Sequence, residues 1–190
     1  GLDDGQPLPL LGGAKLTGRT GAWDLGFIDV QTARSGTRPS ENVGVARVRR
    51  RVLNDRSYAG GLLTTRTGLD GTWSTTYGLD GKLRLTGNEV LTLLWAQTID
   101  SAPGGGHAGR PLRSGFGRLQ WERRQRIGLT YRASVARGGP RFTPSVGFTT
   151  RRDVTELSGT LGYSMLLDGP SPLRLLRPGS VQGEAVLRNP

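Results

Sequence analysis

The chain has 190 residues, of which 34% are hydrophobic and 31 are Gly, so a conventional apolar core would be thinly supplied. It contains no Cys, which excludes disulfides, thiol nucleophiles and zinc–thiolate sites. The net charge of +11 raises nucleic acid or an anionic surface as partners, but the cations are spread along the chain without a nucleic-acid-binding motif, so we expect no nucleic-acid partner.

Short segments along the chain alternate apolar and polar residues, which is the period of a β-strand. This alternation argues against disorder, and no fixed-length repeat supports a solenoid. In chain order, the expected strands cover residues 10–19, 23–32, 42–53, 57–66, 77–85, 90–98, 114–122, 127–135, a segment carrying Val146 and Phe148, 157–165 and 181–187.

The clearest of these strands covers residues 77–85 and has one apolar and one charged face. Its apolar face carries Tyr77, Leu79, Leu83 and Leu85, and its other face carries Gly78, Asp80, Lys82 and Arg84. Only residues 86–89 separate it from the next strand, so the two form a hairpin. A charged face turned to bulk water is the ordinary interpretation of such a strand, and a wet barrel interior is the alternative.

Connection length alternates along the chain, short at one end of the expected sheet and longer at the other. No apolar run approaches the ~18 residues of a transmembrane helix, but a transmembrane strand needs only about 9–11 residues with alternate ones apolar. Short turns on one side and longer loops on the other are typical of outer-membrane barrels. The pattern therefore favours a transmembrane β-barrel.

Aromatic residues near the strand ends would form two girdles at the membrane interfaces. Those expected near the short turns are Trp23, Tyr58, Trp121 and Phe148, and those expected near the longer loops are Trp73, Trp95, Phe142 and Tyr163. The alternative is that aromatics favour strand ends in any sheet.

If the apolar faces meet lipid, the charged residues that alternate with them face inward together. A charged interior is tolerable only if it is wet or mutually paired. The residues expected to face the lumen are Lys15, Arg19, Arg47, Arg49, Arg51, Asp80, Lys82, Arg84, Arg118, Glu122, Arg132 and Glu156.

The expected fold is all-β: an antiparallel up-and-down meander of about ten or eleven strands, an internal part of a transmembrane β-barrel. We expect one partial barrel domain over residues 1–190, truncated at both ends, with no second domain. Because an incomplete barrel leaves two unpaired edges, which are unfavourable in lipid, we predict poor independent folding.

Several runs of residues resemble one bacterial family at corresponding intervals over most of the chain. The similar runs are 9–18, where the match is strongest, then 23–26, 30–32, 46–50 and 142–148. They resemble the C-terminal outer-membrane barrel, a domain of unknown function, of proteins with an N-terminal carbohydrate-binding domain of family-nine type. The resemblance implies an export signal and a sugar-binding-like domain upstream, and it implies no catalytic residues.

Catalytic and cofactor chemistry finds little support in the residues. His107 is the only His and lies in a Gly-rich stretch without an evident Asp partner, so we interpret it as a solvated loop residue. The run 104–106 lacks the following helix and the Gly-Lys-Ser/Thr ending of a phosphate-binding loop. Asp80, Glu122 and Glu156 are expected to pair with Arg rather than to act as acid and base. We expect no catalytic, metal or cofactor site.

Two function classes remain, with an enzyme a distant third. The first is a bacterial outer-membrane barrel that passes or captures an anionic or sugar-like solute through an Arg-rich lumen, or anchors an upstream domain, with outer-membrane lipid as its partner. The second is a soluble all-β module that binds polyanions, glycan or nucleic acid, through a basic face. In the first the apolar faces form a continuous outer belt, and in the second they meet in a dry core.

Overall fold

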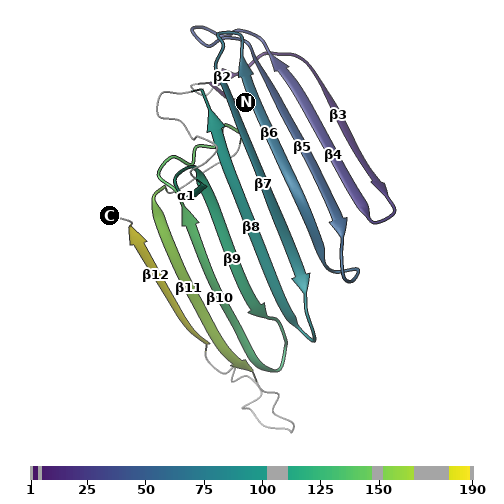
Figure 1. Ribbon diagram of the computed structural model, residues 1–190, viewed down its shortest axis with the longest axis vertical. Helices are drawn as coiled ribbons and strands as arrows, with labels where there is room; N and C mark the ends of the chain where they lie inside the picture. The colour runs from purple at the N-terminus through teal and green to yellow at the C-terminus, as the bar shows by residue number, and fades with distance from the viewer. Residues whose placement is uncertain (1, 4–5, 102–110, 147–151, 165–179, 189–190) are drawn as a thin grey trace.

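One antiparallel sheet of ten strands, in the order β12-β11-β10-β9-β8-β7-β6-β5-β4-β3, dominates the computed structural model (Figure 1). The structure describes residues 2–3, 6–101, 111–146, 152–164 and 180–188. Every strand of this sheet pairs with its neighbours in the sequence, which makes it an up-and-down meander. The sheet is open, with β3 and β12 as its two edges in the described part of the chain.

The strands of the meander are 9 to 12 residues long. A separate two-stranded sheet precedes them, and one short helix lies between β8 and β9. The elements are β1 (Leu2–Asp3), β2 (Gln6–Pro7), β3 (Leu10–Thr20), β4 (Trp23–Thr32), β5 (Glu41–Arg51), β6 (Tyr58–Gly68), β7 (Trp73–Arg84), β8 (Glu89–Asp100), α1 (Pro111–Ser114), β9 (Gly115–Arg123), β10 (Gly128–Gly138), β11 (Val154–Ser164) and β12 (Ser180–Arg188).

The predicted all-β, antiparallel up-and-down class is confirmed, but one predicted strand is wrong. Instead of a strand around Val146, a connection joins β10 directly to β11, which pair from Gly138 and Val154 onward. Two Pro in this connection remove backbone donors that a strand would use. Phe142 stacks on Phe116, with 5.7 Å between ring centroids, and is buried there. Phe148 lies outside the described residues.

The missing strand changes which connections share an end of the sheet. We name the two ends after Gly21, in the β3–β4 turn, and Gly71, in the β6–β7 turn. β11 ends and β12 begins at the Gly21 end, with the short turns, whereas the sequence pattern counted the predicted loop 168–179 between them among the long loops; that loop itself lies outside the described residues. Tyr163, near the end of β11, therefore also lies at the Gly21 end and not at the end with the longer loops, where it was predicted. The predicted separation of loops by length is therefore wrong for this connection.

The β3–β4 hairpin shows how local residues set a turn. Thr20 pairs with Trp23, which leaves a two-residue loop of Gly21 and Ala22. Gly21 has φ of 55°, in the left-handed region that tight hairpin turns require and that Gly adopts without strain.

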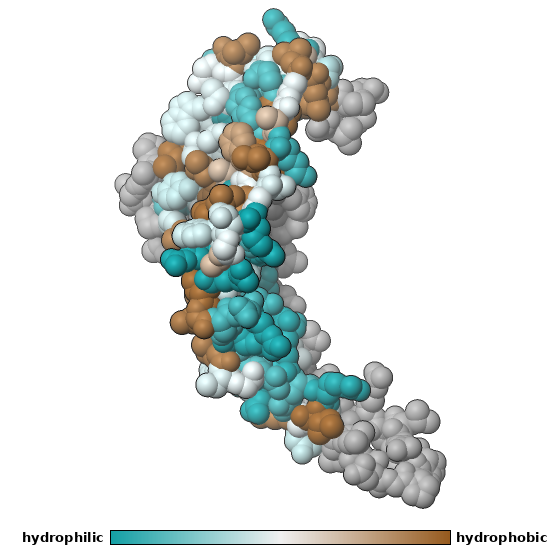
Figure 2. Space-filling model, turned by 90° about the vertical axis from the view of Figure 1, so that its right-hand side faces the viewer, coloured by the Kyte–Doolittle hydropathy of each residue, from teal (hydrophilic) through white to brown (hydrophobic). Residues whose placement is uncertain are grey.

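The sheet is a single curved layer, seen along its edge in Figure 2. In the lower half of that view, hydrophobic residues gather on the convex side and hydrophilic residues on the concave side. Among the described residues, the buried hydrophobic ones are only Val90, Ala136, Phe142 and Val154. The described residues therefore form almost no dry interior, and the two faces of the sheet differ in polarity.

Candidate functional site

The concave face gathers the charged residues that the sequence predicted to lie together. Strand register aligns Arg19, Asp24 and Arg49 in one row, and Asp80, Leu94 and Arg118 in another. The strand pairings place all the residues predicted to face the lumen on this one face: Lys15, Arg19, Arg47, Arg49, Arg51, Asp80, Lys82, Arg84, Arg118, Glu122, Arg132 and Glu156. That this face lines a lumen stays a prediction.

One group of ion pairs spans β3 to β5. Asp24 accepts hydrogen bonds from Arg49, at 2.7 Å from Nη2 and 3.0 Å from Nε, and also pairs with Arg19. The Arg49 guanidinium lies over the Tyr58 ring, 4.8 Å from its centroid. Tyr58 thus faces the polar side of the sheet, so its predicted place in a membrane-facing girdle is wrong.

A second ion pair crosses from β5 to β7. The two terminal guanidinium nitrogens of Arg47 donate hydrogen bonds to the two carboxylate oxygens of Asp80, with 2.7 Å between Nη2 and Oδ2. This forked geometry fixes both side chains more firmly than a single contact would. β6 runs between the two partners, and its residue at the crossing is Gly60.

Glu122 lies in a third group, near the β9–β10 turn, and is only 2% exposed. Its carboxylate accepts hydrogen bonds from Arg124 and from Arg132 Nε, the latter at 3.1 Å. These residues line a cavity of about 350 Å³ together with Arg123, Gln125, Thr130, Tyr131 and Thr160. Because the buried carboxylate is held between two guanidinium groups, its role here is charge pairing.

On the concave face, the side chains of four cations form neither an ion pair nor a hydrogen bond within the described part of the chain: Lys15, Lys82, Arg84 and Arg118. Lys82 and Arg84 are neighbours on one side of β7, and Arg118 lies two strands away. Uncompensated positive charge on a concave surface attracts anions.

The described residues contain no group of three or more His, Cys, Asp and Glu that could hold a metal ion. His107 and the run 104–106 lie outside the described residues. In the part of the chain that the structure describes, no helix is long and apolar enough to cross a membrane.

The convex face is apolar and uncovered. Leu79 is 63% exposed and Leu161 is 54% exposed, although each lies within a strand that pairs with a neighbour on both sides. All four Trp of the chain share this face: Trp23, Trp73, Trp95 and Trp121. No second layer packs against it in the described part of the chain.

Some polar contacts of the convex face lie near its Gly21 end and were not predicted from the sequence; others, such as Asn42 with Asp29 and Tyr77 with Gln97, lie toward the Gly71 end. Glu89 accepts hydrogen bonds from Trp121 Nε1 and from the Tyr131 hydroxyl, each at 2.7 Å. Arg50 lies over the Trp23 ring, 5.1 Å from its centroid. The only signal in the sequence was that Arg50 and Glu89 fall on apolar faces.

The apolar band runs obliquely across the strands. One cross-strand row on the convex face passes through Trp23, Arg50, Leu93, Leu119, Val135 and Leu157. On β4 the apolar residues Leu25 and Phe27 extend from this row toward the Gly71 end. On β11, Leu161 and Tyr163 extend from it toward the Gly21 end. The strands are therefore tilted relative to the band.

No family model, no curated protein and no solved structure matches this chain. Its fold and its two faces define it as an open, amphipathic, all-β meander.

Proposed function

We propose that this chain is part of an outer-membrane β-barrel, with its convex face against lipid and its concave face lining a water-filled lumen. The observation that carries the proposal is the uncovered apolar convex face, because a soluble sheet exposing this much contiguous apolar surface would aggregate. A lipid environment removes that cost, and closure of the barrel by further strands satisfies the two open edges.

The oblique apolar band supports the same proposal. Transmembrane barrel strands are tilted by about 35–45° from the membrane normal, so a band level with the membrane crosses the strand rows at an angle. The aromatics Trp23, Trp121, Tyr131 and Tyr163 follow this tilt, each one row nearer the Gly21 end than the one before. They form a level border in the manner of an interfacial girdle.

The concave face indicates what the lumen would pass or capture. Its carboxylates Asp24, Asp80 and Glu122 pair with Arg, while the side chains of Lys82 and Arg118 have no charge partner among the described residues. Such a lumen favours an anionic or sugar-like solute, as a channel or a capture surface. The residue resemblance adds an upstream carbohydrate-binding-like domain that the barrel would anchor in the bacterial outer membrane. We propose no enzymatic activity.

A second candidate is a soluble all-β module that binds polyanions through the concave face. The free cations of this face favour it. It requires a partner layer that covers the apolar convex face, and the two candidates therefore differ in what Leu83 and Leu85 contact.

Cysteine scanning of residues 77–85 in the full-length protein, in isolated membranes, tests the proposal. The absence of native Cys makes each introduced thiol the only one in this chain. We expect a water-soluble thiol reagent to label the positions of Lys82 and Arg84, and a lipid-phase reagent to label those of Leu83 and Leu85. Protection of the Leu positions from both reagents would mean a dry protein core and would favour the soluble module.

A further inference from the structure

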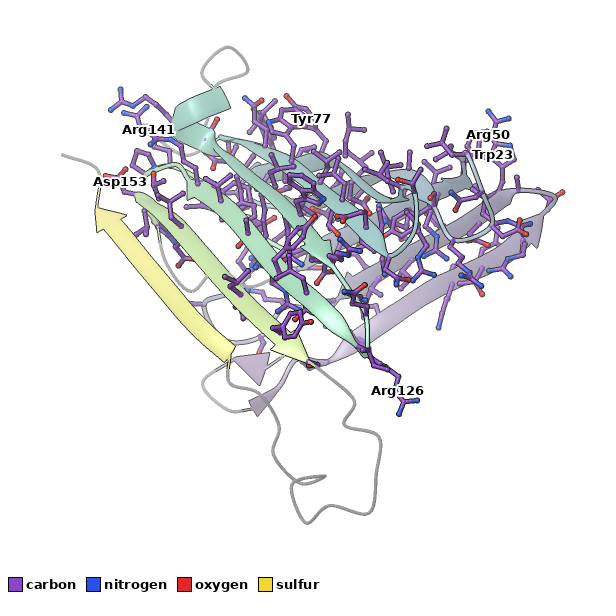
Figure 3. The ribbon with its side chains drawn as sticks, turned by 90° about the horizontal axis from the view of Figure 1, so that it is seen from below. Trp23, Arg50, Tyr77, Arg126, Arg141 and Asp153 are labelled. Atoms are coloured by element: carbon purple, nitrogen blue, oxygen red, sulfur yellow. The ribbon has the colours of Figure 1, made fainter. Side chains whose placement is uncertain are left out.

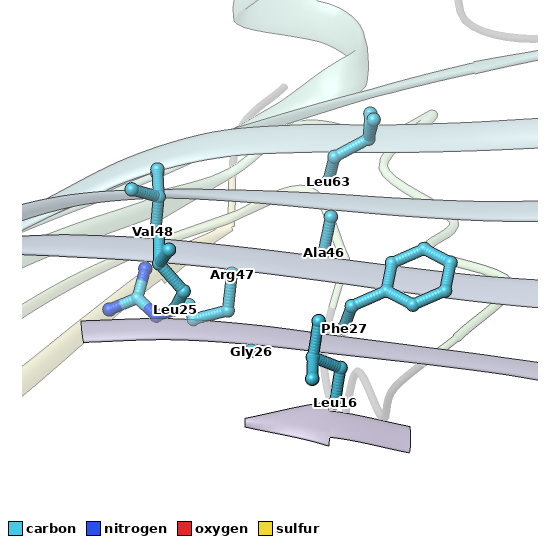
Figure 4. Close-up of a pocket in the computed structure, with 9 residues that line it drawn as sticks. Leu16, Leu25, Gly26, Phe27, Ala46, Arg47, Val48 and Leu63 are labelled. Carbon is cyan, nitrogen blue, oxygen red and sulfur yellow. The ribbon is translucent and has the colours of Figure 1, made fainter. Parts of the chain in front are cut away.

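A depression of about 400 Å³ lies on the convex face over β3 to β6 (Figure 4). Phe27, Ala46 and Leu63 are aligned in one row, and Leu25, Val48 and Gly61 in the next. The depression exists because Ala46 and Gly61 are small, and the large apolar side chains around them form its walls. Its volume falls within the range of about 300–1,000 Å³ that is typical of small-ligand sites.

Two cations lie at this depression: Arg47 is in its lining but pairs with Asp80 on the concave face, and Arg50 lies just beyond one end. Arg50 is two residues beyond Val48 on the same face of β5 and stacks over Trp23, as Figure 3 shows. It is exposed and has no carboxylate partner in the described part of the chain. Asp24, next to Trp23 in the chain, faces the opposite side of the sheet, where it pairs with Arg49.

The apolar depression could hold the apolar tail of a ligand, and the Arg50 guanidinium at its end could bind an anionic head group. This combination fits a molecule with an apolar tail and an anionic head. Trp23 marks the level at which aromatic side chains meet lipid headgroups, which is where a phosphate lies when its acyl chain runs along the strands. A guanidinium binds phosphate through two parallel hydrogen bonds. A protein partner would have to leave Arg50 unpaired or supply a carboxylate for it.

We infer that the depression and Arg50 form a binding site for one anionic glycerophospholipid, with an acyl chain over Ala46 and Gly61 and the phosphate on Arg50. This inference rests on the proposed membrane location. It assigns Arg50 a positioning role for lipid that the other cations of the same end, such as Arg56 in the β5–β6 turn, do not share.

Trp23 itself provides the readout. In a variant of the full-length protein, Trp73, Trp95 and Trp121 are changed to Phe, so that Trp23 is the only Trp left in this chain. This variant is reconstituted in phosphatidylcholine vesicles. These contain a minor fraction of phosphatidylglycerol with brominated acyl chains. Bromine quenches Trp fluorescence on contact, so quenching reports the local fraction of the anionic lipid. We expect about fivefold enrichment over its bulk fraction, the amount that one interfacial Arg supplies.

Two variants and a control separate the parts of the site. Arg50→Gln should abolish the enrichment, and Ala46→Phe, which fills the depression without changing charge, should reduce it severalfold. Arg56→Gln removes the same charge at the same end and should leave it unchanged. Two results would contradict the proposed site: quenching in proportion to the bulk fraction of phosphatidylglycerol, or an equal loss of enrichment in Arg50→Gln and Arg56→Gln. If no brominated lipid quenched Trp23 at all, the membrane proposal itself would fail.

Discussion

At the scale of single residues, Gly60 lies where the Arg47–Asp80 ion pair crosses β6. The guanidinium of Arg47 passes over the backbone of β6 at this position, and a Cβ on Gly60 would lie 3.2 Å from each of its terminal nitrogens and 2.9 Å from Val48 O. At Gly61, the next residue, a Cβ would meet its nearest neighbours at 3.7 Å, which is ordinary contact. A side chain at Gly60 would therefore force the Arg47 guanidinium and the Val48 carbonyl to shift.

We predict that Gly60→Ala displaces Arg47 and lowers the free energy of unfolding by about 1–2 kcal/mol, through loss of charge-assisted hydrogen bonds. Gly61→Ala, on the opposite face of the same strand, should leave stability nearly unchanged. Denaturant unfolding of both variants in the same lipid or micelle environment measures the difference. Equal losses in the two variants would show that glycine flexibility in β6, rather than room for Arg47, is what matters.

At the scale of elements, the β6–β7 turn is held by one exposed carboxylate. Asp70 Oδ1 accepts hydrogen bonds from the Thr72 hydroxyl at 2.6 Å and from the Thr72 backbone N–H at 3.0 Å. These bonds, the hydroxyl first, lower the pKa of Asp70 below its usual value. A lowered pKa in the folded state stabilises the turn above the unfolded pKa of about 4, and this contribution is lost as pH falls through the folded pKa.

We predict that Asp70→Ala destabilises the hairpin at neutral pH and that the deficit relative to the unchanged chain shrinks as the pH is lowered below about 4. Hydrogen exchange of the amides around Thr72, compared between the two proteins across this pH range, measures it. Thr72→Val removes only the hydroxyl donor and should reproduce part of the effect. A deficit that stays constant with pH would mean that the carboxylate charge plays no part in the turn.

Another element shows where tertiary contacts override local pattern. Alternation predicted a strand around Val146, yet the connection between β10 and β11 packs Phe142 on Phe116 and bonds Arg141 N to Arg113 O at 2.7 Å. Thr143 Oγ1 adds a hydrogen bond to Asp100 at 3.3 Å. The partners of these bonds lie on α1, β8 and β9, so no pattern within the connection itself could have predicted them.

At the scale of the whole molecule, the two faces of the sheet should tolerate charge differently. Leu79 is 63% exposed on the convex face, and Leu62 is 38% exposed on the concave face of the neighbouring strand. We predict that Leu79→Arg lowers stability in bilayers by about 2–4 kcal/mol, the cost of Arg on the lipid face near the midplane. Leu62→Arg should cost little, because a wet lumen solvates the guanidinium.

The measurement is the free energy of unfolding of each variant of the full-length protein in lipid vesicles. A larger loss for Leu62→Arg than for Leu79→Arg would reverse the assignment of the faces and contradict the lipid-facing convex surface.

Apart from the strand wrongly predicted around Val146, the sequence by itself determined the strands and their two faces. Alternation is a local property, so placing Lys82 and Arg118 on one face required no knowledge of distant residues. Asp24 shares this face and was equally accessible to the same reasoning, since it alternates with Trp23 and Leu25.

Only the tertiary structure decided which of these residues meet. The Arg47–Asp80 pair depends on strand register and on the gap at Gly60, and the contact of Glu89 with Trp121 and Tyr131 joins three strands. The curvature that separates a convex apolar face from a concave charged one is likewise a property of the assembled sheet. The physical reason is that alternation follows from the geometry of one chain segment, whereas side-chain contacts depend on the register and spacing of segments far apart in the sequence.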